Sequence, residues 1–300
     1  MIDALQRLVW QLENETLLLE PNQLRQRLEA LDLLDAHLSD AFQSASDTQS
    51  SMTELHRRAK AIHARLEAVN CELYRAIRNE IQSGNRPDAL LGWVRSLAAI
   101  EDVDGAANDM GYDHLDELVS GVLQFVEPDA TLAPREPEMV FYQPTPARHI
   151  FNLIDRTAFT PTDVLVDLGS GLGHVALLVS ICTCARSVGI ELEAAYVERA
   201  RQCAQSLNLN MITFVQQDVR SADLSAGTVF YLYSPFTGSI LKRVLNRLRH
   251  EAATRQIQIC SYGPCTSVVA EEPWLEAMTV PVTYRVTIFR SRSRNSMPLT

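Results

Sequence analysis

Residues 164–178 read VLVDLGSGLGHVALL and decide the fold of the second half of the chain. The apolar run Val164–Leu168 predicts a buried strand, and the pattern after the last glycine predicts a helix. Between them, Gly169, Gly171 and Gly173 let the chain turn sharply and let a ligand approach the backbone with no Cβ in the way. A strand, a glycine-rich turn and a helix in this order indicate a site for a nucleotide-like ligand.

Short apolar runs alternate with helical patterns from residue 146 onward. This alternation predicts a parallel sheet with both faces covered by helices. Residues 280–282 and 284–290 follow as two strands with no helix between them, which predicts a closing hairpin. The expected fold is α/β: a Rossmann-like seven-stranded sheet with an antiparallel C-terminal hairpin, preceded by an all-α helical domain. The other strands are expected at 164–168, 187–191, 211–216, 228–233 and 257–261, with helices at 172–182, 194–207 and 239–250.

The front half of the chain reads as helices. Apolar residues recur every three or four positions over 24–38 and over 55–81, which predicts two long helices folded back as an antiparallel hairpin. A serine or threonine near 50–53 is expected to cap the second of them. Shorter helices are expected around 90–99 and 115–125. A bundle covering the second domain explains this pattern; a coiled coil for homodimer formation or substrate docking is the alternative.

A proline-rich stretch separates the two regions. Residues 127–147, EPDATLAPREPEMVFYQPTPA, contain five prolines. Proline fixes φ and removes a backbone donor, so the stretch predicts a linker or an ordered loop. We therefore expect a helical bundle domain over 1–130 and a ligand-binding domain over 131–300.

The net charge of −10 is unevenly placed along the 300 residues. Residues 1–135 hold 12 Lys and Arg against 23 Asp and Glu, whereas residues 136–300 hold 15 against 14. The acidic front half repels phosphate backbones, which argues against a general nucleic-acid partner. No apolar run is long enough for a membrane span, and no signal-peptide pattern opens the chain. The six cysteines show no paired C-x-x-C spacing, so we expect a cytoplasmic protein with reduced thiols and no metal site.

Three acidic residues follow three successive predicted strands. Asp167 stands beside the glycines, Glu191 ends the next strand, and Asp218 comes directly after the third. A dinucleotide site and an S-adenosylmethionine site are the two alternatives. A carboxylate beside the glycines opposes a pyrophosphate but suits a ligand with an ammonium group and a positive sulfur. Glu191 follows Asp167 in the sequence at about the separation that places a carboxylate where it accepts hydrogen bonds from ribose hydroxyls.

The stretch from Phe141 to about Arg290 resembles the class I S-adenosylmethionine-dependent methyltransferases. VDLGSGLGHV, preceded by FYQPTPARHIFNLID, is similar to the non-SET histone lysine methyltransferase family and its bacterial relatives. The resemblance implies a seven-stranded sheet that ends in an antiparallel hairpin, with S-adenosyl-L-methionine as cofactor. It implies cofactor roles for Asp167, Gly169, Ser170, Gly171 and Gly173 in the turn, Glu191 at the ribose, Asp218 at the adenine, and Tyr142, Pro144 and Thr145 at the methionine end.

The segment after the fourth predicted strand departs from this family. It reads YLYSPFTG, so Ser234-Pro235-Phe236 stands where amino-methylating enzymes carry an Asn or Asp followed by Pro-Pro and an aromatic residue. A histone substrate is therefore not carried over. Tyr233, Ser234 and Phe236 are the candidate catalytic residues, and Tyr231 is expected to pack as a strand residue. His174 is expected to cap or pack, and Trp274 either shapes a substrate pocket or fills a gap.

These observations predict a methyltransferase whose acceptor is a protein lysine or a small molecule. A non-catalytic cofactor-binding scaffold that acts through the helical domain is one alternative. A nicotinamide-dependent oxidoreductase is another.

Overall fold

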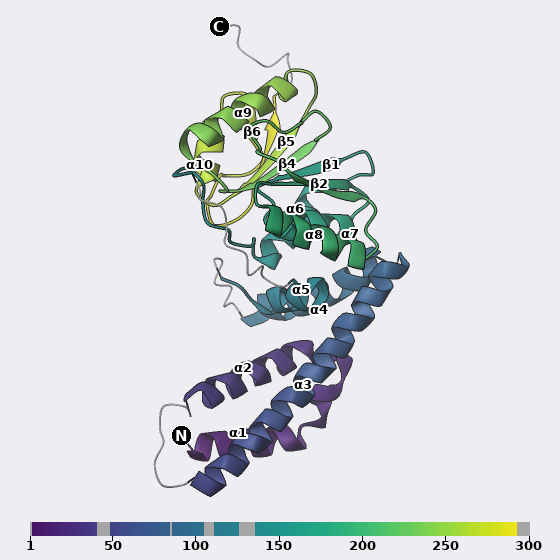
Figure 1. Cartoon of the computed structure of the whole chain (residues 1–300), viewed down its shortest axis with the longest axis vertical. Coiled ribbons are helices and arrows are strands. Elements are labelled where there is room, and N and C mark those ends of the chain that lie inside the picture. The colour runs from purple at the N-terminus through teal and green to yellow at the C-terminus, as the bar shows by residue number, and fades with distance from the viewer. Residues whose placement is uncertain (1, 41–48, 85, 105–110, 126–135, 293–300) are drawn as a thin grey trace. The chain divides into compact units, whose positions relative to one another are not determined.

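The computed structural model describes residues 2–40, 49–84, 86–104, 111–125 and 136–292 (Figure 1). The chain forms two compact units, Met1–Asn79 and Glu80–Thr300. This division differs from the boundary expected near residue 130. Two helices of the front half, α4 (Arg86–Asp104) and α5 (His114–Leu123), belong to the second unit because α4 packs on α7 and α5 packs on α6.

The first unit is helical. It contains α1 (Ile2–Asn14), two single 3₁₀ turns (Thr16–Leu19 and Pro21–Gln23), α2 (Leu24–Asp40) and most of α3 (Gln49–Ser83). Side-chain contacts pair position 27 with 70 and position 35 with 63, so α2 and α3 run antiparallel as expected. The expected cap near 50–53 is wrong because α3 already begins at Gln49.

A buried cation holds the first unit together. Arg27 is fully buried, and its guanidinium donates to Asn70 Oδ1 at 2.6 Å, to the Leu18 carbonyl at 3.0 Å and to the Pro21 carbonyl at 3.2 Å. A buried charge is tolerated only when its donors are satisfied, and here a neutral amide and backbone carbonyls of the 3₁₀ turns satisfy them. The apolar periodicity of α2 does not reveal this residue.

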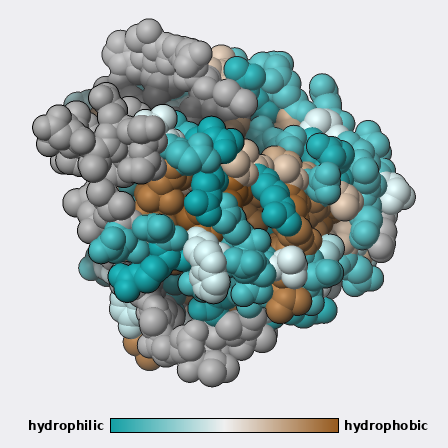
Figure 2. All heavy atoms as spheres, turned by 90° about the horizontal axis from the view of Figure 1, so that it is seen from below, coloured by the Kyte–Doolittle hydropathy of each residue, from teal (hydrophilic) through white to brown (hydrophobic). Residues whose placement is uncertain are grey.

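Figure 2 shows hydrophobic side chains gathered between hydrophilic ones on one face of the molecule. In the first unit Trp10, Leu17 and Leu33 are each more than half exposed. None of the helices over the described ranges is both long and apolar enough to cross a bilayer.

The second unit is built on a seven-stranded sheet in the order β3-β2-β1-β4-β5-β7-β6, which confirms the expected fold. The first five strands are parallel to one another. The central strands read as continuous apolar runs because helices cover both faces. The strands are β1 (Val164–Leu168), β2 (Arg186–Glu191), β3 (Ile212–Gln216), β4 (Val229–Tyr233), β5 (Gln258–Tyr262), β6 (Leu275–Ala277) and β7 (Thr287–Ser291).

The closing hairpin is present, but one of its strands is not where we expected it. β7 pairs antiparallel with both β5 and β6, and β6 is Leu275–Ala277. The expected strand at 280–282 is wrong: these residues lie in the connection between β6 and β7. Pro281 explains the difference, because proline cannot donate to a sheet ladder.

Helices cover both faces of the sheet. Figure 1 shows α6 (Ala147–Thr157), α7 (His174–Cys182) and α8 (Ala194–Ser206) on one face, with α9 (Gly238–Ala252) and α10 (Cys265–Ala270) on the other. Because β1 to β5 are parallel, their carboxyl ends meet at one edge of the sheet. Ligands of open α/β sheets bind at this edge.

Candidate active site

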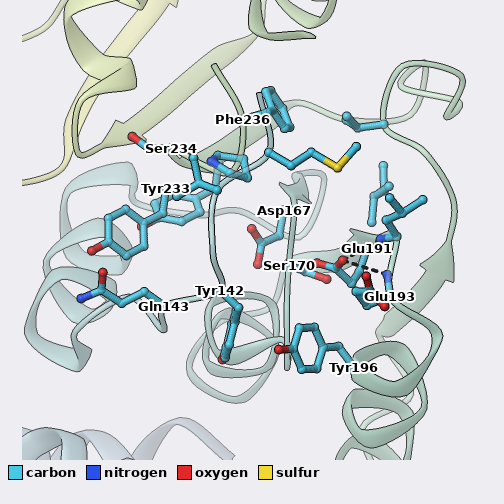
Figure 3. Close-up of a pocket in the computed structure, with 18 of the residues that line it drawn as sticks. Tyr142, Gln143, Asp167, Ser170, Glu191, Glu193, Tyr196, Tyr233, Ser234 and Phe236 are labelled. Carbon is cyan, nitrogen blue, oxygen red and sulfur yellow. Dashed lines mark hydrogen bonds between the residues drawn. The ribbon is translucent and has the colours of Figure 1, made fainter. Parts of the chain in front are cut away.

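A cavity of about 400 Å³ opens at the carboxyl ends of β1 to β4. Figure 3 shows its side chains converging from several elements. Eleven of the thirteen residues predicted for the site line it, and Gly171 and Gly173 lie in the turn beneath. The eleven are Tyr142, Pro144, Thr145, Asp167, Gly169, Ser170, Glu191, Asp218, Tyr233, Ser234 and Phe236.

The glycine turn leaves no room for a side chain at its centre. Gly171 has a φ of +53°, a region that favours glycine. The ring of Tyr142 lies directly against it, so that a Cβ on Gly171 would overlap Tyr142 Cε2. The turn therefore forms a close-fitting floor under the segment that carries Tyr142.

Two carboxylates stand at the ends of β1 and β2. Asp167 is 4% exposed, and burial, reinforced by the nearby Glu191, raises its pKa to about 8. Glu191 instead accepts backbone N–H bonds from Gly171 at 2.8 Å, Leu192 at 2.7 Å and Glu193 at 3.0 Å. A buried carboxyl with little to compensate its charge favours a cationic ligand, because such a ligand offsets the cost of ionising it. An ammonium group or a sulfonium fits this position, whereas a pyrophosphate does not.

The third acidic residue is held by an arginine. Asp218 accepts from Arg220 Nε at 3.0 and 2.9 Å and from the Arg220 backbone N–H at 2.8 Å. The hydrogen bond to the Arg220 side chain is the main cause that lowers the Asp218 pKa. A carboxylate offers about four lone-pair sites. Asp218 thus stays ionised at the rim of the cavity, with Arg220 contacting both of its oxygens.

The segment before α6 is fastened over the cavity by tyrosines. Tyr142 Oη lies 3.1 Å from His174 Nδ1, and burial lowers the pKa of His174 to about 4. The neutral imidazole shares a hydrogen bond with the Tyr142 hydroxyl, and burial raises the pKa of this phenol, so it stays protonated. The Thr145 hydroxyl bonds Tyr231 Oη at 2.9 Å. His174 therefore positions Tyr142, and Tyr231 lines the cavity besides packing in the strand.

The wall after β4 is uncharged. Tyr233 is partly buried beside Tyr262, with ring centroids 4.5 Å apart, and burial raises its pKa to about 12. Phe236 is 5% exposed and lines the cavity. Ser234 has a left-handed φ of +41°; its Oγ accepts from the Cys265 N–H at 2.9 Å and donates to the Tyr262 carbonyl at 3.3 Å. The hydroxyl of Ser234 is thus engaged in holding the start of α10.

Sequence reasoning missed Tyr112. Its hydroxyl donates to the Pro144 carbonyl at 2.9 Å, and its side chain also bonds Gln143. The phenol is close enough to Tyr233 to contribute to the raised pKa of that residue. Tyr112 belongs to the helical front half, where no motif pointed to the site. Trp274, in contrast, is buried in the core and donates to Glu272 at 2.6 Å, so it fills a gap and does not line the cavity.

Comparisons with known proteins find a family model and solved structures that match part of the chain. A family model described as Histone methylation protein DOT1 matches residues 139–227. No curated protein matches the chain.

Solved structures also match. An RNA methyltransferase from Salinibacter ruber in complex with S-adenosyl-L-homocysteine is 25% identical, with 52% of this chain and 97% of that chain covered and a TM-score of 0.41. A putative S-adenosyl-L-methionine-dependent methyltransferase from Methanococcus maripaludis is 14% identical over 48% and 83%, with a TM-score of 0.40. The magnesium protoporphyrin IX methyltransferase of Synechocystis is 15% identical over 49% and 79%, with a TM-score of 0.37.

The matched family segment, the strand order and the glycine turn with its buried acid define the class. The chain is a class I S-adenosylmethionine-dependent methyltransferase, and S-adenosyl-L-methionine is its cofactor. Within that class, the stretch over 139–227 is similar to the histone methylation protein DOT1.

Proposed function

We propose that this enzyme methylates an amine nitrogen, with a lysine side chain on a protein as the acceptor. The main observation in support of this acceptor is the uncharged wall made by Tyr233, Gln143 and Phe236, which Tyr112 borders. The cavity's carboxylates belong instead to the β1, β2 and β3 ends. Phenol faces attract an ammonium group, and phenol oxygens accept from an amine N–H.

The cofactor orientation we propose follows the charges. Asp167 would face the ammonium and sulfonium end, Glu191 the ribose and Asp218 the adenine. Tyr142, Pro144 and Thr145 would cover the methionine end, and Gly169 and Ser170 would line the turn. A buried carboxyl with a raised pKa at the centre and an ionised one at the rim support this order.

The macromolecular acceptor is supported by the rim of the cavity. Phe141 is 81% exposed and Val140 is 46% exposed, and both line the opening. Exposed apolar side chains beside a cleft are typical of surfaces that another molecule covers. A lysine on a protein reaches into the cleft while its chain covers this rim.

When bound, the cofactor supplies a methyl group on a positively charged sulfur. The chain's own residues hold the acceptor nitrogen in line with it, and alignment alone is worth several kcal/mol, up to ~7–11. Held by Asp167, Glu191 and Asp218, the cofactor would supply the methyl carbon to the amine lone pair, and the electrons of its S–C bond would leave on the sulfur. Tyr233 is no base near neutral pH, because its pKa is about 12. It accepts an N–H bond, and the amine loses its proton to water at the open mouth.

The test is transfer of tritiated methyl by the full-length protein to a lysine-containing peptide. The same peptide with acetylated lysine or with arginine in its place serves as the control. Label in the lysine peptide alone is expected, at a rate that rises with pH as more amine is neutral. Label that enters a hydroxyl compound or RNA and not the amine would refute the acceptor class without touching the cofactor.

The exposed apolar residues of the first unit support a second proposal, that two copies associate through the helical region. Trp10, Leu17 and Leu33 are the candidates for the contact. Light scattering should report a dimer for the wild type and a monomer for Trp10→Asp. A monomeric wild type at high concentration would refute it.

A further inference from the structure

Arg220 joins two carboxylates that are far apart in the sequence. It bonds Asp218 through Nε, and its NH2 group lies 2.6 Å from Asp218 Oδ2. The same guanidinium donates to Glu136 at 2.9 and 2.5 Å. Asp218 is at the cavity rim, whereas Glu136 begins the described segment 136–146.

That segment carries the other end of the site. Tyr142, Gln143 and Thr145 follow Glu136 and line the cavity. The first residues of the segment are also tied to the wall after β4, since the Val140 N–H donates to the Pro235 carbonyl at 3.1 Å. The Glu136 ion pair therefore anchors the start of the segment that covers the site.

We propose that Arg220 is a positioning residue that couples the two ends of the cofactor site. It orients Asp218 toward the adenine and, through Glu136, holds segment 136–146 over the methionine end. The inference rests on the cofactor orientation proposed above. A guanidinium suits this role because its planar fork can serve two carboxylates at once, whereas a lysine ammonium is a point charge.

Two ligands distinguish the contact of Arg220 with Asp218 from its contact with Glu136. S-adenosylhomocysteine occupies both ends of the site, whereas adenosine lacks the amino-acid end. We expect Glu136→Gln to weaken S-adenosylhomocysteine binding about 3- to 5-fold, as for loss of one partly exposed ion pair, and adenosine binding less than 2-fold. Asp218→Asn should weaken both ligands to the same extent. The double variant R220A/E136Q should bind no more weakly than R220A, because Arg220→Ala already breaks the pair with Glu136.

Salt offers a readout that a purely structural role would not move. The Glu136 and Arg220 side chains are 49% and 24% exposed, so ions screen their attraction. Raising NaCl from 0.05 to about 0.5 M, where the screening length shrinks several-fold, should weaken S-adenosylhomocysteine binding in the wild type more than in E136Q. Equal salt dependence in the two proteins would overturn the coupling.

Glu251→Gln is the matched control. It removes the ion pair between Glu251, near the end of α9, and Arg255. Neither residue lines the cavity, so binding should be unchanged. Thermal denaturation of each variant checks that the fold is kept. If E136Q binds S-adenosylhomocysteine as E251Q does, or loses both ligands equally, the inference is wrong. If D218N leaves adenosine binding unchanged, the adenine placement fails and the inference fails with it, while methyl transfer to an amine is untouched.

Discussion

The two walls of the cavity are built in different ways. The cofactor wall comes from the ends of β1, β2 and β3, with glycines, backbone amides and the carboxylates of Asp167, Glu191 and Asp218. The acceptor wall gathers Gln143 and Tyr233, bordered by Tyr112, from segments about 30 to 120 positions apart in the chain, as their numbers show. The first wall recognises charge in a fixed place, and the second offers neutral aromatic surface. Substitutions on the two walls should therefore change different steps.

The largest effect is expected at the floor of the cofactor wall. Gly171→Ala places a methyl group against the Tyr142 ring at a φ of +53°, so we expect S-adenosylhomocysteine affinity to fall at least about 100-fold, equivalent to about 3 kcal/mol. Calorimetric titration measures it. Gly92→Ala is the control, because Gly92 lies in α4 with open space around it. An affinity within 3-fold of the wild type would show that the turn does not hold the cofactor.

Asp167→Asn should lower the affinity for the cofactor by a smaller factor and change how this affinity depends on pH. Wild-type affinity for S-adenosylmethionine should rise with pH up to about 8, because a cation binds best once this carboxyl has ionised. The variant should bind about 10- to 100-fold more weakly at pH 8, corresponding to one lost buried charge pair, and show no such rise. Titrations from pH 6 to 9 test it, and a rise that persists in the variant would assign the proton elsewhere.

The same carboxyl predicts a trade between binding and stability. Its pKa is raised on folding, so the folded state holds the proton more tightly than the unfolded state. The free energy of unfolding of the ligand-free protein should therefore fall as pH rises from the unfolded value of about 3.9 toward 8. Asp167→Asn should remove this fall and raise the melting temperature at pH 8, unless cofactor is added. Denaturant unfolding at pH 6 and 8 compares the two proteins.

Substitutions on the acceptor wall should spare the cofactor. Tyr233→Phe removes a hydrogen-bond acceptor for the amine but keeps the ring, so we expect kcat to fall about 10-fold, or about 1.4 kcal/mol. Tyr112→Phe should lower kcat about 3-fold. This loss is smaller because the Tyr112 hydroxyl already donates its proton to the Pro144 carbonyl. Binding of S-adenosylhomocysteine should change less than 2-fold in both. A loss of cofactor affinity equal to the loss of kcat would remove the distinction between the walls.

The smallest catalytic effect is expected at Ser234. Its hydroxyl is engaged with Cys265 and Tyr262, so Ser234→Ala should lower the free energy of unfolding by about 1–2 kcal/mol and change kcat/KM less than 3-fold. Urea denaturation and methyl-transfer kinetics measure the two quantities. A large loss of kcat with unchanged stability would return Ser234 to the chemistry.

The sequence was a good guide where local patterns decide structure. The five parallel strands and the glycine turn follow from apolar runs and from glycines that must turn, and the structure confirms them. The predicted position of β6 was wrong. The two valines on either side of Pro281 suggested a strand, although proline has no backbone N–H to donate to a sheet. Tyr112 and the Arg220 bridge were not visible at all, because both depend on contacts between residues at least 30 positions apart. No local spacing encodes such contacts.

The buried Arg27 of the first unit has a consequence for how α2 can sit on α3. Its Nε–H meets Asn70 on α3 in one alignment of the two helices only, whereas its bonds to the Leu18 and Pro21 carbonyls are local to the turns before α2. A slip by one helical turn, about 5.4 Å, would leave the Nε–H of this buried guanidinium without its acceptor on α3. Leucine contacts tolerate such sliding, because one leucine replaces another. A single buried polar residue thus fixes the register of two helices whose apolar contacts alone would allow several registers.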